Sequence, residues 1–448
     1  MKMLSIKGII KLLLPKKVKK YIIRFKYKLL EVQDYPAKYS QLKKHKIALE
    51  KVREKARKKN KIIVAFFALH SSVWKYDELY RIMSSDNRFE TIVIVCPVVD
   101  YGRENMLSEM HKTFNFFKGN RYNVVKSYDD KSETFVDVKK EIGPDIIFYT
   151  NPYQGLIDER YYITNFEDTL TCYVRYFFQS ISVDQHGRDF IFHNRLWKFF
   201  CETEYHTKYA LKHYSINKNK YVYTGYPGVD GLIYNNKFEN KRKKDNKILK
   251  KIIWAPHHTI DPKQELYLSN FLNYYKLMID IANKYSERAE FTFKPHPLLK
   301  VKLYQHDDWG KERTDEYFKI WDSMPNTMLQ SDDYKEVFNN SDAMIFDCNS
   351  FVVEYLYTGK PSLFTFTNDK IEKIFNGFGK KALNYHYHGY CEKDIIRFIE
   401  KVVLEENDIK IKDRDKFYRE YLISPNNRTA SENIFEELNM SIWLDSSL

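Results

Sequence analysis

The stretch Ile345–Phe364 reads IFDCNSFVVEYLYTGKPSLF and places a strand, a turn and a helix in close succession. Its first apolar residues predict a short buried strand that ends at Asp347. Asn349 and Ser350 follow, and both residue types favour the capping position of a helix, which we expect to begin near Phe351. A second apolar run comes after this helix. The order strand, helix, strand predicts a parallel sheet with helices on its faces.

The same alternation extends in both directions along the chain. A basic linker, KFENKRKKDNK, interrupts it once and divides it into two α/β halves. The expected strands of the first half are 61–69, 91–97, 124–128 and 145–150, and those of the second half include 250–258, 343–348 and 361–366. We therefore predict a basic helical segment (1–60), an N-terminal Rossmann-like lobe (61–235), a C-terminal Rossmann-like lobe (246–395) and closing helices (396–448). Two such lobes place a site in the cleft between them, at the carboxyl ends of the strands.

The composition favours an anionic partner. The chain has 448 residues, a formal net charge of +14 and a pI of about 9.1. Such a charge suits nucleic acid, anionic lipid or a phosphorylated substrate. The five cysteines form no CxxC pair, which argues against a disulfide framework or a zinc ribbon and fits a reducing cytoplasm.

The N-terminal segment, MKMLSIKGIIKLLLPKKVKK, alternates short apolar blocks with lysines. It contains no run of about 20 apolar residues and no cleavage site, so we expect neither a membrane-spanning helix nor a signal peptide. Its pattern is typical of an interfacial helix that lies on an anionic membrane surface. The alternative is a solvated basic helix packed on its own protein.

Histidines and hydroxyl residues gather where the predicted strands end. His70 follows the first strand, His257 and His258 follow the strand after the linker, and His296 lies in FKPHP. Pro295 and Pro297 restrict the backbone around His296, so its ring has few orientations. Such a histidine can donate to a phosphate oxygen or protonate a leaving group.

The helix expected after Ser350 would present free backbone N–H groups to an anion. Glu354, one turn into this helix, could accept from a ribose or close the cap. The alternative is an ordinary helix cap without a ligand. HYHGY (386–390) could bind a metal, but no carboxylate spacing supports it, so we expect no metal site and no cofactor. Nucleic-acid binding ranks last, because the positive charge concentrates in 1–61 and the linker rather than along a groove, and no RRM, KH or zinc-finger pattern occurs.

The C-terminal half resembles the CDP-glycerol glycerophosphotransferases, the family of teichoic-acid primases and polymerases. WAPHHTID is similar to the family's APTWRD segment, FKPHPLL to its histidine loop, and DCNSFVVEYLYTGKPSLFTF to DYSSVYFDYLLLNKPIIFY. TGYPGVDGLI resembles GYPRNDLL, and SPNNRTASENIFEEL resembles the closing helix. The resemblance covers about 221–440, and the N-terminal lobe only weakly.

This resemblance implies a GT-B fold, a CDP-activated alditol donor, a lipid-linked or polymeric acceptor, and a peripheral protein on the cytoplasmic face of a bacterial membrane. It implies that His296 assists the donor phosphates. The other expected donor-phosphate ligands are Ser350, Asn349, His258, Thr259 and Lys294, and the expected nucleotide ligands are Glu354 and Asp347.

The sequence departs from the family on the acceptor side. The family's WHG histidine acts as a base, and the corresponding region here, CYVRYFFQSI (172–181), has no histidine. Tyr176 could take its place, although a neutral tyrosine is a poor base at pH 7. His70 or His186 could substitute. The missing arginine of the APTWRD segment suggests a capsule or surface-polysaccharide branch.

Two other functions stay open on the sequence alone. A GT-B glycosyltransferase that uses a nucleotide sugar would share the fold and the phosphate site. An inactive membrane-bound scaffold of an assembly complex would explain the missing histidine.

Overall fold

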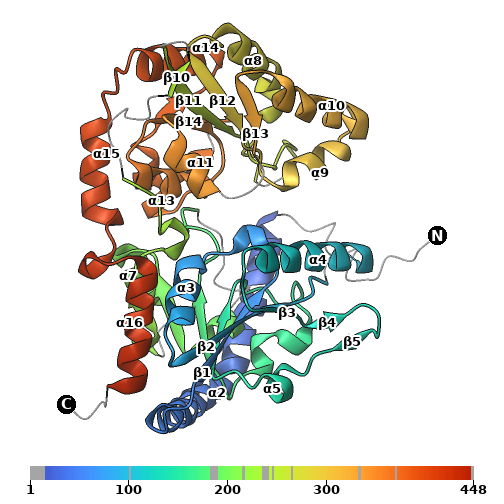
Figure 1. Ribbon diagram of the computed structural model, residues 1–448, viewed down its shortest axis with the longest axis vertical. Helices are drawn as coiled ribbons and strands as arrows, with labels where there is room; N and C mark the ends of the chain where they lie inside the picture. The colour runs from blue at the N-terminus through green and yellow to red at the C-terminus, as the bar shows by residue number, and fades with distance from the viewer. Residues whose placement is uncertain are drawn as a thin grey trace.

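A computed structural model describes residues 16–99, 102–181, 190–213, 217–234, 242–244, 247–263, 266–330, 334–368 and 371–444. The chain forms two lobes, one above the other in Figure 1, and each lobe is built on a sheet covered by helices. The fold is therefore α/β with two Rossmann-like lobes, as the sequence predicts.

The N-terminal lobe contains a seven-stranded sheet in the order β3-β2-β1-β6-β7-β8-β9, with every neighbouring pair parallel. Its strands are β1 Ile62–Ala68, β2 Phe89–Val95, β3 Val124–Lys126, β6 Ile146–Tyr149, β7 Leu170–Val174, β8 Lys198–Cys201 and β9 Tyr221–Tyr223. A small antiparallel pair, β4 Tyr128–Asp129 and β5 Thr134–Phe135, lies beside it. The helices of this lobe are α3 Asp77–Ser85, α4 Arg103–Gly119, α5 Val138–Glu141, α6 Phe190–Arg195 and α7 Glu204–His213.

The C-terminal lobe contains the sheet β13-β12-β11-β14-β15-β16, also parallel throughout. Its strands are β11 Lys247–Ala255, β12 Ala289–Phe293, β13 Thr327–Leu329, β14 Ala343–Phe346, β15 Ser362–Thr365 and β16 Tyr387–Gly389. The short strand β10 Arg242–Lys244, inside the predicted basic linker, pairs antiparallel with β11. The helices are α8 Phe271–Lys284, α9 Leu298–Tyr304, α10 Gly310–Ser323, α11 Tyr334–Asn340, α12 Phe351–Glu354, α13 Gly377–Leu383 and α14 Glu392–Arg397.

The closing helices connect the two lobes along one side of the molecule (Figure 1). α14 continues into a π-helical stretch, Phe398–Leu404, and α15 Ile411–Phe417 continues into a second, Tyr418–Leu422. α16 Ala430–Trp443 then packs against α3 of the N-terminal lobe. The capping box expected at its start is present, because Thr429 accepts from the backbone N–H of Glu432 and Glu432 accepts from that of Thr429.

The helix α2, Lys16–Arg57, confirms the helical character expected for this part of the chain. Its C-terminal half packs on the N-terminal lobe, with Gln41, His45, Ala48 and Val52 buried. The apolar residues expected to face a membrane, from Leu4 to Leu14, lie outside the described residues. Among the residues that are described, none belongs to a helix that is long and apolar enough to cross a membrane.

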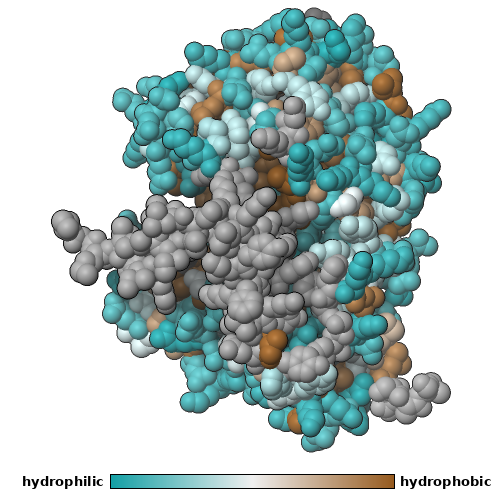
Figure 2. All heavy atoms as spheres, turned by 180° about the vertical axis from the view of Figure 1, so that it is seen from behind, coloured by the Kyte–Doolittle hydropathy of each residue, from teal (hydrophilic) through white to brown (hydrophobic). Residues whose placement is uncertain are grey.

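One apolar cluster continues across the junction of the lobes. Phe178, which follows β7, has its ring centroid 5.3 Å from that of Tyr226 and 5.8 Å from that of Phe378 in the C-terminal lobe. The described surface seen from behind is mostly hydrophilic (Figure 2). The loop after β7 thus faces the C-terminal lobe, where the predicted donor-side residues lie.

Candidate functional site

Three histidines meet at the carboxyl ends of two neighbouring strands in the C-terminal lobe. His257 and His258 follow β11, and His296 follows β12, which pairs with β11 in parallel. Their ring centroids lie 4.2 Å (His257–His258), 5.0 Å (His257–His296) and 4.1 Å (His258–His296) apart. We call these residues the histidine cluster. The sequence placed all three at strand ends, and the structure brings them into contact.

Asp347, at the end of β14, holds the loop that carries the cluster. Its two carboxylate oxygens accept hydrogen bonds from the backbone N–H of His257 at 2.5 Å and of Asn270 at 2.7 Å. The side chain is buried, and desolvation raises its pKa to about 7. Asp347 therefore shapes the histidine loop, and the nucleotide contact expected for it stays a prediction.

Backbone hydrogen bonds fix which ring nitrogen carries the proton on two of the histidines. The N–H of Leu298 donates to Nδ1 of His296 at 3.1 Å. The N–H of Thr259 donates to Nδ1 of His257 at 3.4 Å, and with Nδ1 as acceptor the Thr259 hydroxyl, 2.9 Å away, donates to it as well. A ring nitrogen that accepts a hydrogen bond carries no proton, so each neutral imidazole is protonated at Nε2. His257 and His296 thus present Nε2–H donors.

The histidine cluster is neutral at ordinary pH. Burial lowers the pKa of His296 to about 3 and that of His258 to about 4, and it holds the pKa of His257 well below its usual value. The neighbouring His258 and Lys294 lower the pKa of His296 further. A neutral imidazole can still donate a hydrogen bond to developing negative charge. The cluster is built to donate rather than to exchange protons with water.

The donor set suits an anion better than a metal ion. One nitrogen from each of the three rings could lie within 4.8 Å of the others, which is close enough to surround a cation. A metal needs an unprotonated nitrogen on every ligand, however, and the backbone bonds leave protons on Nε2 of His257 and His296.

The other metal motif considered in the sequence, HYHGY (386–390), has a structural role. In it, His386 contacts the Ser362 hydroxyl at 2.6 Å and the Val352 carbonyl at 2.7 Å.

α12 begins at Phe351, as predicted, and Ser350 occupies its N-cap position, but the prediction that the side chain there caps the helix is wrong. Ser350 has helical dihedrals (φ −67°, ψ −37°) and its side chain makes no capping hydrogen bond. Its hydroxyl lies 3.2 Å from the thiol of Cys348, and the carbonyl of Asn349 accepts from the Ser180 hydroxyl of the N-terminal lobe at 2.7 Å. α12 has only four residues before a 3₁₀ turn, Tyr355–Thr358, so its dipole adds little to an anion site.

Glu354 faces the N-terminal lobe. Its side chain is fully buried, which raises its pKa, and the charge of Lys75 and a hydrogen bond from Tyr334 oppose that rise. Lys75 follows β1 and donates to the Tyr334 hydroxyl at 3.4 Å. Glu354 thus takes part in a contact between the lobes, and the ribose contact expected for it stays a prediction. Thr259 and Lys294 are also buried, at the base of the histidine cluster.

The bases that the sequence suggests for the acceptor have different hydrogen-bond partners in the structure. His70 Nδ1 lies 3.0 Å from a carboxylate oxygen of Glu109 on α4, a partner that no sequence pattern indicates. Tyr176 donates its hydroxyl hydrogen to Tyr153 at 3.3 Å. His186 lies outside the described residues. The contacts of Lys75 with Tyr334 and of Ser180 with Asn349 show that the loops after β1 and β7 both reach the C-terminal lobe.

Comparison with solved structures shows the same fold. The wall teichoic acid polymerase TagF has a TM-score of 0.51 and 14% sequence identity, with 94% of this chain and 98% of that chain covered. A protein described as a UDP-N-acetylglucosamine 2-epimerase from Listeria monocytogenes has a TM-score of 0.50 and 12% identity, with 85% of this chain and 96% of that chain covered. These likenesses place the chain among GT-B-like structures.

Comparison of sequences gives the family. No curated protein sequence matches the chain significantly. A family model, however, described as CDP-glycerol:poly(glycerophosphate) glycerophosphotransferase, matches residues 182–438, which is more than half of the chain. The match includes the whole C-terminal lobe with its histidine cluster. The chain therefore belongs to the CDP-glycerol:poly(glycerophosphate) glycerophosphotransferase family.

Proposed function

We propose that the protein transfers a phosphoalditol unit, such as glycerol phosphate, from a CDP-activated donor to a hydroxyl group of a lipid-linked or growing surface polymer of the teichoic-acid or capsule type. The observation that carries this proposal is the histidine cluster, with two Nε2–H donors fixed by backbone hydrogen bonds at the carboxyl ends of β11 and β12. In parallel α/β sheets, this edge is where ligands bind.

The geometry of the cluster suggests how it assists the reaction. The Nε2–H groups of His257 and His296 donate to oxygens of the donor diphosphate, and Lys294 adds a positive charge nearby. When the acceptor hydroxyl attacks the β-phosphorus, the bond from that phosphorus to the bridging oxygen breaks and CMP leaves with the electron pair. The donors stabilise the charge that develops on CMP without losing a proton themselves.

Turnover with a matched pair of histidine variants tests this role. His296→Ala should lower the rate of CMP release from CDP-glycerol by about 10²–10³-fold, as the loss of one oxyanion donor does elsewhere. His306→Ala is the control. His306 also accepts a backbone N–H at Nδ1, from Asp308 at 3.2 Å, but it lies outside the cluster. Equal loss in both variants, or in neither, would contradict the proposed role.

The same assay separates the two other functions. A nucleotide-sugar glycosyltransferase would release UDP from a UDP-sugar and would leave CDP-glycerol and CDP-ribitol intact. A scaffold would bind no nucleotide, and His296→Ala would leave the polymer yield in cells unchanged.

We also propose that the protein binds the cytoplasmic face of the membrane through its N-terminal segment, where the basic residues Lys16, Lys17, Lys19 and Lys20 begin α2. Because each lysine near an anionic surface contributes about 1 kcal/mol, replacing all four with glutamine should weaken vesicle binding by about 10³-fold. Sedimentation with phosphatidylglycerol vesicles measures this change, and phosphatidylcholine vesicles are the control. Undiminished sedimentation of the variant would contradict the proposal.

A further inference from the structure

His70 occupies an acceptor-side position at the carboxyl edge of the N-terminal sheet. It lies two residues after the end of β1, the central strand that pairs with β2 and β6. Five residues later in the same loop, Lys75 contacts Tyr334 of the C-terminal lobe. This loop therefore reaches from β1 to the other lobe, and His70 lies at its start, at the carboxyl edge of the sheet.

Glu109 fixes the tautomer of His70. An ionised carboxylate only accepts hydrogen bonds, so the 3.0 Å contact places the proton of a neutral His70 on Nδ1. The hydrogen bond with His70 is the main cause that lowers the pKa of Glu109 and keeps it ionised. Nε2 of His70 then carries a free lone pair. This is the opposite tautomer to that of His257 and His296, which present N–H groups.

The helix that carries Glu109 is held firmly against the loop of His70. The hydroxyl of Thr113 on α4 donates to the carbonyl of Leu69 at 3.4 Å. The ring of Phe117, also on α4, packs edge-on against Trp74 with centroids 4.8 Å apart. The two side chains of the pair are still partly accessible, with 26% of His70 and 29% of Glu109 exposed. The pair is thus pre-oriented and can be reached by an acceptor.

We propose that His70 is the general base for the acceptor hydroxyl and that Glu109 is its positioning residue, an inference that rests on the proposed function. The hydroxyl oxygen forms a bond to the β-phosphorus while its proton passes to Nε2 of His70. CMP leaves with the electrons of the broken phosphorus–oxygen bond, and the proton on His70 is later released to water. Glu109 stabilises the imidazolium that forms in between.

Tyr176, the other acceptor-side base predicted from the sequence that lies within the described residues, is less suited to this role. The hydroxyl hydrogen of Tyr176 is donated to Tyr153, and a neutral phenol accepts protons poorly. The pair of His70 and Glu109 supplies both a basic nitrogen and the carboxylate that orients it.

The test measures CMP release from CDP-glycerol, with a short synthetic poly(glycerol phosphate) primer as acceptor. His70→Ala should lower kcat by about 10²–10⁴-fold, the usual contribution of a general base, and leave the KM for CDP-glycerol within about twofold. Imidazole added to the buffer should restore part of this loss, which a merely structural role of His70 would not allow. Glu109→Ala should lower kcat by at least about 10-fold, and Glu109→Asp should recover part of that loss.

Glu104→Ala is the matched control, because Glu104 is an exposed carboxylate on the same helix. It should keep the wild-type rate. If His70→Ala is fully active while His186→Ala is not, the base is His186 and the inference is overturned. A wild-type enzyme that releases no CMP refutes the proposed function and this inference together, whereas an active wild type with unaffected His70 and Glu109 variants refutes only the inference.

Discussion

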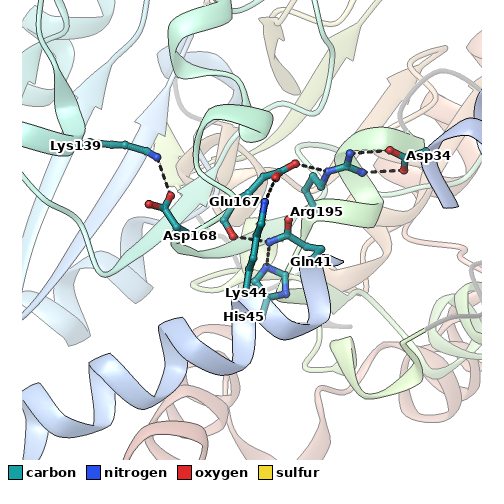
Figure 3. A network of polar contacts seen from close by, with 8 residues as sticks. All are labelled: Asp34, Gln41, Lys44, His45, Lys139, Glu167, Asp168 and Arg195. Atoms are coloured by element: carbon teal, nitrogen blue, oxygen red, sulfur yellow. Dashed lines mark hydrogen bonds and ion pairs between the residues drawn. The ribbon is translucent and has the colours of Figure 1, made fainter. Parts of the chain in front are cut away.

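Replacing Arg195 with methionine is expected to lower the free energy of unfolding by about 3–5 kcal/mol, because it leaves a buried carboxylate without its cation. Arg195, at the end of α6, is 7% exposed and contacts both oxygens of Asp34 on α2 at 2.7 and 2.8 Å (Figure 3). Its Nε donates to Glu167 at 2.8 Å. Without Arg195, Asp34 still accepts a hydrogen bond from the side-chain amide of Asn194 at 2.7 Å, but its charge has lost its cation.

A neighbouring ion pair in the same network provides the control. Lys139 contacts Asp168 at 2.7 Å, but the two side chains are 43% and 66% exposed. An exposed pair of this kind contributes about 0–1 kcal/mol, so Lys139→Met should change stability little. Methionine has a long apolar side chain at both positions, so the two variants differ mainly in burial of the lost pair.

Urea unfolding followed by circular dichroism measures both variants. The double variant Asp34→Asn/Arg195→Met should lose less than the sum of the two single losses, because neither charge is then left alone. If Arg195→Met costs no more than Lys139→Met, the network does not anchor α2.

Two further predictions concern the C-terminal lobe. Asp347→Asn should cost about 1–3 kcal/mol, since an amide cannot accept from both His257 and Asn270, and calorimetry should show weaker binding of CDP-glycerol. The second concerns His386. Burial lowers its pKa to about 3, so as the pH falls below about 6.5 this imidazole binds a proton in the unfolded chain before it does so in the folded protein. The stability that neutral His386 provides is thus lost on acidification, and the destabilisation by His386→Asn should be about 2 kcal/mol smaller at pH 5 than at pH 7 in urea unfolding. A stronger affinity of Asp347→Asn, or a pH-independent cost of His386→Asn, would contradict these expectations.

The long apolar strands could be predicted because burial on both faces requires continuous apolar residues. β1, β2, β6, β11 and β14 all lie within or beside the predicted runs. β7, β8, β9 and β16 were missed. β8, β9 and β16 have only three or four residues, and their lysine, tyrosine or histidine leaves no clear period, whereas β7 is a fully buried run of five residues that was not assigned from the sequence. HYHGY was considered as a metal motif, but its central residues form β16, an edge strand of the sheet.

The site was predictable only as far as strand order determines it. Histidines at the ends of β11 and β12 had to approach each other because these strands are neighbours in a parallel sheet. Their tautomers depend on the backbone N–H groups of Leu298 and Thr259, which no sequence pattern reveals. Glu109 lies 39 positions from His70 and meets it only through the packing of α4. The predicted side-chain cap at Ser350 is not formed because Ser350 has helical dihedrals, which local propensity does not reveal.

The most direct test of the central claim is the mass of the product formed by the wild-type protein. The protein is incubated with CDP-glycerol and the poly(glycerol phosphate) primer, and mass spectrometry follows both primer and nucleotide. We expect each CMP released to be matched by one glycerol phosphate unit added to the primer. An unchanged primer, together with release of UDP from a UDP-sugar and a product that carries a sugar instead of a new phosphodiester, would contradict the claim that this protein is a phosphoalditol transferase.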